Sequence, residues 1–406
     1  MTKYCRQTIR LCAVVASLLL PGCSQRPAES PQDRWGAWRS YAGSSDSSQY
    51  SSLKQINREN VAQLEVAWTF ATGKANHRST PIIIDDVMYV VANGGVTALD
   101  AATGEQKWFA PDTVTPSVRG LAYWRSEDDV DQRLLVTKTH YLQALDATTG
   151  ELVPSFGHNG RIDLREGLGR DPETITRIAT GTPGRVFENL IIVGSAMGDE
   201  SYDAAPGDIR AYDVRSGELV WTFHTIPHPG EAGYETWPPE AWKTVGAANA
   251  WSTMSVDEQR GIIYVPTGAP SYHFFGADRA GDNLYANSLI ALDARTGKRL
   301  WHFQAIHHDV WDYDLAMAPK LLTVERNGRE IDAVALAGKH GFLFVFDRVT
   351  GEPVFPIEER PVPQSDVPGE RTSPTQPFPV DIPPFANLTL AQNDLSPYAD
   401  PAEKKQ

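Results

Sequence analysis

The sequence predicts an all-β fold and, within that class, a β-propeller. Three observations support this prediction: a short segment recurs five times, the copies are far apart and irregularly spaced, and convincing amphipathic helices are nearly absent. Apolar residues alternate or run together on both sides of each copy, which is the pattern of strands joined by a turn. The chain has 406 residues, enough for one large domain or two smaller ones.

The repeated segment reads as strand, turn and strand. Its third residue is an Asp whose carboxylate caps the turn, and four residues later a Gly supplies the positive φ that the reversal needs. Similar apolar runs fill most of the remaining chain, as in PIIIDDVMYVVA, RLLVTKTHYLQAL and GIIYVPTG. The five copies are Ala98–Trp108, Ala144–Leu152, Ala211–Trp221, Ala291–Trp301 and Val345–Phe355.

The spacing of the copies and their terminal tryptophans favour a propeller over other all-β folds. Irregular intervals fit four-stranded blades of ~40–50 residues that carry inserted loops. Three copies end in Trp, and a Trp at that position is suited to wedge between adjacent blades. A β-sandwich or a β-helix is the alternative, but neither explains the long period together with the docked Trp.

Composition and charge exclude several classes of function. A hydrophobic content of 41% with 11 Trp is typical of a globular, core-forming chain. The net charge of −14 argues against nucleic acid and anionic lipid as partners. All three cysteines lie in the first 23 residues, so we expect no internal disulfide, catalytic Cys or zinc–thiolate site in the mature protein.

The N-terminus has the features of a lipoprotein signal peptide. Three basic residues precede the apolar run at 11–20, which is too short to cross a bilayer core of ~30 Å. The run ends in Leu-Pro-Gly-Cys23, which resembles a bacterial lipobox, and Ser24 resembles the type sorted to the outer membrane. We therefore expect a periplasmic lipoprotein anchored at Cys23, in the outer rather than the inner membrane. The alternative is an ordinary signal peptide with an incidental Cys.

Polar and aromatic residues suited to a binding site cluster in five segments. They are HHDVWDYD at 307–314, GKHG at 338–341, RGLAYW at 119–124, AANAWSTM at 247–254 and GSAMGDE at 194–200. Together with the repeats and the segment Tyr50–Phe70, they resemble the pyrroloquinoline quinone (PQQ)-dependent, or quinoprotein, glucose and alcohol dehydrogenases. The resemblance runs from about residue 35 to about residue 385 and covers the N-terminal part of the family's propeller.

The resemblance implies a role for each candidate residue. PQQ is a planar ortho-quinone with three carboxylates, and Trp251 would form the floor under its ring. Arg119 and Ser195 would contact the cofactor, and Lys339 would bond to the quinone oxygens and stabilise the charge of the reduced form. Asp309 would be the general base that takes the proton of a substrate hydroxyl while hydride passes to C5 of PQQ.

The resemblance also implies a divalent metal, a substrate class and an electron acceptor. Asp309 and Asp199 would hold Ca²⁺ or Mg²⁺, because a site rich in oxygen favours a hard cation over zinc. Glu200 is the alternative to Asp199 in this segment. The substrate would be a small alcohol or a sugar, and electrons would pass to a membrane quinone or cytochrome c.

Each of these residues also has a plain structural interpretation. The acids of 307–314 and 199–200 could instead lie in solvated turns, and Arg119 could pair with one of the many acids. Trp251 could be a core residue, and Lys339 could lie on an exposed surface. The methanol enzymes carry an Asn metal ligand in a Thr-Gly-Asn-Pro turn, and this chain has Ala269 at that place. The function therefore has an alternative: a non-catalytic propeller lipoprotein scaffold or an inactive, truncated paralogue.

The resemblance divides the chain into four parts. We expect a signal peptide at 1–22, a linker at 23–34, a partial quinoprotein propeller at 35–385 and a polar tail at 386–406. The family's ring has eight blades, of which we expect about five here, with Trp68 on the first strand. Truncation, completion by a partner chain and early closure of the ring are all possible, and we favour truncation.

Overall fold

The structure is a computed structural model that describes residues 35–73, 79–115, 119–197, 202 and 204–389. The described chain forms a succession of antiparallel sheets, so the all-β prediction is confirmed. The first two four-stranded sheets are β1 (Ile82–Ile84), β2 (Val87–Ala92), β3 (Gly95–Asp100) and β4 (Gln106–Ala110), then β5 (Ala122–Arg125), β6 (Gln132–Lys138), β7 (Tyr141–Asp146) and β8 (Arg161–Asp163).

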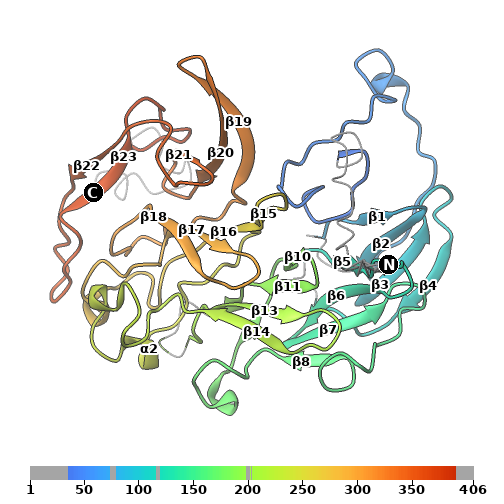
Figure 1. The fold of residues 1–406 in the computed structure, drawn as a ribbon, viewed down its shortest axis with the longest axis horizontal. Helices are drawn as coiled ribbons and strands as arrows, with labels where there is room; N and C mark the ends of the chain where they lie inside the picture. The colour runs from blue at the N-terminus through green and yellow to red at the C-terminus, as the bar shows by residue number, and fades with distance from the viewer. Residues whose placement is uncertain (1–34, 74–78, 116–118, 198–201, 203, 390–406) are drawn as a thin grey trace, which may run out of the picture.

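Two further four-stranded sheets and one three-stranded sheet follow. Figure 1 shows the sheets following one another along an arc, as expected for propeller blades, while the number of blades and the closure of a ring stay predictions. The strands are β10 (Arg185–Phe187), β11 (Leu190–Val193), β13 (Ile209–Asp213) and β14 (Leu219–Phe223); β15 (Ser255–Asp257), β16 (Ile262–Pro266), β17 (Ser288–Asp293) and β18 (Arg299–Gln304); and β19 (Lys320–Arg326), β20 (Arg329–Ala337) and β21 (Leu343–Asp347).

The remaining elements are small. The longest helix of the described residues is α2 (Ala241–Thr244), and none of the described helices has the length and apolar character needed to cross a bilayer. The others are the paired strands β9 (Ile178–Ala179) and β12 (Ala196–Met197), the paired strands β22 (Ile357–Pro361) and β23 (Thr375–Pro379), and the 3₁₀ turns η1 (Val61–Gln63), η2 (Pro172–Thr174), η3 (Tyr234–Thr236) and η4 (Ala277–Arg279).

The apolar core lies between neighbouring sheets. Val96 of β3 packs in one cluster with Leu134 of β6, and Ile192 of β11 packs in another with Ile263 of β16. Each pair of sheets along the arc shares such a cluster, which explains why the strands carry nearly continuous apolar runs.

The repeat tryptophans join consecutive sheets as predicted. The indole N–H groups of Trp108, Trp221 and Trp301 donate to backbone carbonyls in the turn of the next copy, at 3.1, 3.1 and 3.2 Å. Each ring also covers the glycine of that turn, where even a Cβ would approach the Trp ring within 2.7 Å. Each of these contacts between copies therefore requires a Trp at the end of one copy and a Gly, which has no side chain, in the turn of the next.

The segment around Trp68 and the second copy of the repeat depart from the general pattern. Trp68 docks on the first copy, with its indole N–H 3.3 Å from the carbonyl of Ala101, but residues 64–72 form no strand, so the predicted strand at Trp68 is wrong. Instead of a strand ladder, Asn93 donates its backbone N–H to the Thr72 carbonyl (3.1 Å) and its side-chain amide to the Ala71 carbonyl (3.3 Å). The second copy lacks Trp, and Gly157 packs on the next turn instead.

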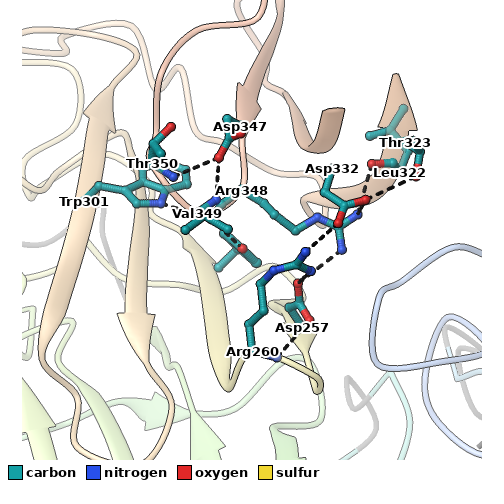
Figure 2. Close-up of polar contacts among 11 residues, drawn as sticks. Asp257, Arg260, Trp301, Leu322, Thr323, Asp332, Asp347, Arg348, Val349 and Thr350 are labelled. Atoms are coloured by element: carbon teal, nitrogen blue, oxygen red, sulfur yellow. Dashed lines mark hydrogen bonds and ion pairs between the residues drawn. The ribbon is translucent and has the colours of Figure 1, made fainter. Parts of the chain in front are cut away.

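A charged network reinforces the joint between the fourth and fifth sheets (Figure 2). Arg348, whose carbonyl accepts the Trp301 indole N–H, donates from its guanidinium to the carboxylate of Asp257 at 3.2 Å. Arg260 donates to the same carboxylate at 2.8 Å and to Asp332 on β20 at 2.5 Å. Burial raises the pKa of Asp257, but the bonds from Arg260 and Arg348 outweigh it, and the net pKa is lowered.

The antiparallel order gives each sheet two distinct edges. Connections from the first to the second strand and from the third to the fourth leave on one side, where the repeat turns lie. Connections from the second to the third strand, and from each sheet to the next, leave on the opposite side. We call this second side the site face.

Candidate active site

All five candidate residues with described side chains come from loops of the site face. Arg119 precedes β5 in the connection from the first sheet, and Trp251 and Asp309 lie in the connections that precede β15 and β19. Ser195 follows β11 and Lys339 follows β20, both in connections from a second to a third strand. The topology thus gathers segments that are far apart in sequence onto one side of the arc.

The ring of Trp251 is the centre of this group. The guanidinium carbon of Arg119 lies 5.1 Å from the ring centroid, and the ammonium of Lys339 lies 5.9 Å from it. The indole N–H donates to a carboxylate oxygen of Asp314 at 3.1 Å, which sets the orientation of the ring. Since the ring is only partly buried, a flat aromatic surface bordered by two cations is available to a planar anion.

Lys339 is held by two carboxylates. Its ammonium donates to Asp312 at 2.6 Å and to Asp314 at 2.7 Å. Burial lowers the pKa of Lys339, but the bonds to Asp312 and Asp314 outweigh it, so the net pKa is raised and the group is a cation at neutral pH. Burial also raises the pKa of Asp314, and the Lys339 ammonium opposes that shift.

Asp309 is a buried carboxylate, with 1% of its surface exposed. One oxygen accepts the Trp311 N–H at 2.9 Å, and the other accepts the Tyr313 N–H and the side-chain amide of Asn287, both at 2.8 Å. Burial raises the pKa of Asp309 to about 6, partly offset by these donors and by Arg279. At neutral pH the group is therefore ionised, and about one of its four acceptor positions is free to take a proton.

Sequence reasoning missed two residues of this site. The guanidinium of Arg279, 1% exposed, donates to the backbone carbonyl of Asp309 and, at 2.8 Å, to Asn283. Asn287, fully buried, donates to the Asp309 carboxylate. Both lie in the long connection between β16 and β17, where no motif marks them. A buried Arg or Asn cannot be told from an exposed one by residue type alone.

The two remaining candidates of the cofactor and metal site are Ser195 and Asp199. Ser195 is buried beside the Trp251 segment, since its carbonyl accepts the side-chain N–H of Asn249 at 2.5 Å. Its hydroxyl has no hydrogen-bond partner within the structure. Asp199 lies outside the described residues, as does Cys23. The structure thus brings Arg119, Trp251 and Lys339 together around one aromatic ring.

Comparison with known proteins assigns the family. Residues 38–406 match the family model described as the glucose/ethanol/alcohol dehydrogenase β-propeller domain, PQQ. The chain belongs to this PQQ dehydrogenase family. The resemblance inferred from the repeats and the site segments is therefore confirmed at the level of the family.

Individual relatives in the PQQ dehydrogenase family are similar over about half their length. The chain is 34% identical to the quinate/shikimate dehydrogenase (quinone) of Acinetobacter baylyi, covering 88% of this chain and 48% of that protein. It is 33% identical to quinoprotein glucose dehydrogenase A of Acinetobacter calcoaceticus, with the same two coverages. The quinohemoprotein alcohol dehydrogenase of Comamonas testosteroni superposes with a TM-score of 0.70 at 29% identity, covering 86% of this chain and 52% of that one.

The residues of the site fit the family's cofactor. A partly open Trp ring between two cations matches a planar tricarboxylate, and the unpaired hydroxyl of Ser195 is a buried polar atom that needs a partner. For a metal, the described residues contain no group of three His, Cys, Asp or Glu side chains that converge. They do offer the Asp309 carboxylate and, next to it, an unpaired amide oxygen on Asn287, which are hard oxygen donors.

Proposed function

We propose that this protein oxidises a hydroxyl group of an alcohol or a sugar with PQQ bound against Trp251. One observation carries the proposal: Arg119 and Lys339 lie over the partly open Trp251 ring, and that ring is hydrogen-bonded to the loop that holds Asp309. Bound PQQ supplies the quinone that accepts the hydride. Stacking on Trp251 orients its plane, while Arg119, Ser195 and Lys339 bind its polar groups.

Asp309 is the general base in this proposal. A buried carboxylate whose pKa is about 6 is ionised at neutral pH and accepts the proton of a substrate hydroxyl as the C–H bond breaks. Two backbone N–H groups and Asn287 hold the carboxylate in one orientation. The Lys339 ammonium is available to stabilise negative charge that develops on an oxygen nearby, because its pKa is raised.

The metal, the electron acceptor and the location are further parts of the proposal. Asp309 and Asp199 are the acidic ligands of Ca²⁺ or Mg²⁺, and electrons pass on to a membrane quinone or cytochrome c. The name of the quinate/shikimate dehydrogenase (quinone) supports a quinone acceptor. A lipid on Cys23 anchors the protein at the periplasmic side of the outer membrane. Cys23→Ser should then release the chain from the membrane fraction, and retention of the variant would contradict the anchor.

A dye-linked assay tests the enzymatic proposal. PQQ and Ca²⁺ are added to the purified chain, and reduction of an artificial dye is followed with a panel of primary alcohols and aldoses. Turnover with at least one substrate class supports the proposal. Absence of turnover with the whole panel, in protein that retains its fold by circular dichroism, favours the alternative of a non-catalytic propeller scaffold or inactive paralogue.

A further inference from the structure

Asp309 and its bonded neighbours include residues with unpaired polar atoms. Asn287 Oδ1, Arg279 Nε and His308 Nε2 are buried and have no hydrogen-bond partner within the structure. Asn287 and Arg279 both bond to Asp309, and His308 precedes it in the chain. Buried polar atoms are nearly always paired, because leaving one unpaired carries its full desolvation penalty. The unpaired oxygen of Asn287, whose nitrogen donates to the Asp309 carboxylate, therefore indicates a polar ligand at this place.

The side-chain amide of Asn287 is hydrogen-bonded through its nitrogen but not through its oxygen. Its nitrogen donates to Asp309 Oδ2 at 2.8 Å and to the Tyr313 carbonyl at 3.1 Å, which occupies both of its hydrogens. Its oxygen, on the same carbon, has no partner, and the residue is fully buried. Rotating the amide would place that oxygen against the Tyr313 carbonyl and the Asp309 carboxylate, so the observed orientation is the one that the hydrogen bonds support.

The chemistry of this pair selects a cation. A carboxylate and an amide carbonyl oxygen are both ligands of Ca²⁺ and Mg²⁺, which bind oxygen and accept amide oxygens beside carboxylates. The backbone N–H of Asn287 donates to the Gly268 carbonyl at 3.0 Å, which fixes Asn287 beside the loop that carries Ala269. Among the described residues no three His, Cys, Asp or Glu side chains converge, and the Asn287 oxygen would add a ligand of another type to Asp309.

We propose that Asn287 is a metal ligand, and that its amide oxygen and the Asp309 carboxylate bind the divalent cation together. This inference rests on the proposed function, because it assigns a ligand of the same site. It also gives a reason for an Asn in this position: one half of the amide positions the carboxylate, and the other half binds the ion that the carboxylate shares.

Two substitutions at Asn287 separate a ligand from a mere hydrogen-bond donor. Asn287→Ala removes the oxygen and the donor, whereas Asn287→Asp keeps an oxygen and loses the donor. Ca²⁺ is titrated calorimetrically into the purified chain, with and without PQQ. We expect Asn287→Ala to weaken Ca²⁺ binding at least about tenfold, as loss of even an outer partner of a metal ligand does. Asn287→Asp should bind Ca²⁺ at least as tightly as the wild type.

A matched control accounts for the added charge. Asn283→Asp places the same charge in the same connection, but its oxygen accepts from Arg279 at 2.8 Å, so it should not tighten Ca²⁺ binding. Equal Ca²⁺ affinity in the wild type and Asn287→Ala would overturn the inference, and so would an Asn287→Asp variant as weak as Asn287→Ala. Wild-type protein that binds PQQ by absorbance titration but takes up neither Ca²⁺ nor Mg²⁺ would overturn it together with the proposed metal, while the proposed oxidation by bound PQQ would stand.

Discussion

The indole N–H of Trp251 lies 3.1 Å from the carboxylate of Asp314, and the same carboxylate accepts the Lys339 ammonium at 2.7 Å. One buried acid thus positions both the proposed floor for the cofactor and one of the two cations above it. Because Asp314 also accepts the Ala269 N–H at 2.7 Å, three loops of the site face meet at this single side chain. The position of the Trp251 ring is therefore coupled to the loop that carries Asp309.

Removing the ammonium of Lys339 should weaken PQQ binding. Loss of one hydrogen bond to a charged group costs about 1.5–3 kcal/mol, which corresponds to roughly 10–150-fold in affinity. We expect a loss of this size for Lys339→Met in a titration of the cofactor by absorbance. Lys243→Met is the control, since Lys243 lies 4.9 Å from the ring centroid of Trp242, a different tryptophan, and should leave the affinity unchanged. Equal affinities of the two variants would contradict the role of Lys339.

Replacing the base should stop turnover and spare binding. Asp309→Asn keeps the size and most hydrogen bonds of the buried group but cannot accept a proton at neutral pH. We expect kcat in the dye-linked assay to fall by about 10²–10⁴-fold, the range for a lost general base, with PQQ affinity within a few-fold of the wild type. Turnover at the wild-type rate in this variant would show that another group takes the proton.

Replacing a repeat glycine that lies under a tryptophan ring by alanine should lower the free energy of unfolding, because the added Cβ would clash with that ring. Gly297 has φ +70°, and a Cβ there would lie 2.5 Å from the Trp221 ring, whereas Gly328 has φ +72° and nothing within 4 Å. Gly328→Ala should cost only the backbone strain of about 1–2 kcal/mol. Gly297→Ala should cost at least about 1 kcal/mol more in urea denaturation, because it also overpacks the joint. Equal losses would contradict the docking role.

The buried acid Asp208 should make stability depend on pH. Burial raises its pKa to about 6 from an unfolded value near 3.8, so the folded state holds the proton more tightly. Its stabilising contribution is complete below pH ~4 and is lost as the pH rises through ~6. Asp208→Asn, which cannot ionise, should match the wild type near pH 4 and be more stable at pH 7.5 by up to about 3 kcal/mol.

Denaturation at the two pH values checks this prediction. Asp112→Asn is the control, because Asp112 is an exposed partner of Lys138, and exposed ion pairs contribute about 0–1 kcal/mol. A stability difference between Asp208→Asn and the wild type that does not grow with pH would mean that Asp208 ionises freely in the folded protein.

Local patterns in the sequence predicted the repeat turns and the contacts between consecutive sheets. The Asp and Gly of each repeat reappear as turns in which, for example, Asp100 accepts the N–H groups of Ala102 and Thr103 and Gly104 has φ +74°. The terminal tryptophans dock as predicted. The absence of a strand at Trp68 was not predictable from its apolar neighbours, because a strand requires a pairing partner, and this segment bonds to the turn at Asn93.

The site was predictable where a motif marked it and not elsewhere. The segments that contain Arg119, Trp251 and Lys339 do converge on one ring, and Asp309 lies in the loop bonded to it. Arg279 and Asn287 could not be predicted from the sequence, because their roles depend on burial and on hydrogen bonds to Asp309. Both arise only when the chain folds.

Binding of PQQ to the purified chain tests the central claim most directly. PQQ is titrated into the wild type and into Trp251→Ala, and its absorbance is followed to saturation. The account predicts saturable binding of one PQQ per wild-type chain and at least about tenfold weaker binding in Trp251→Ala, since stacking on one aromatic ring is worth about 1–3 kcal/mol. Absence of saturable binding to folded wild-type protein, or equal binding by the two proteins, would contradict the account.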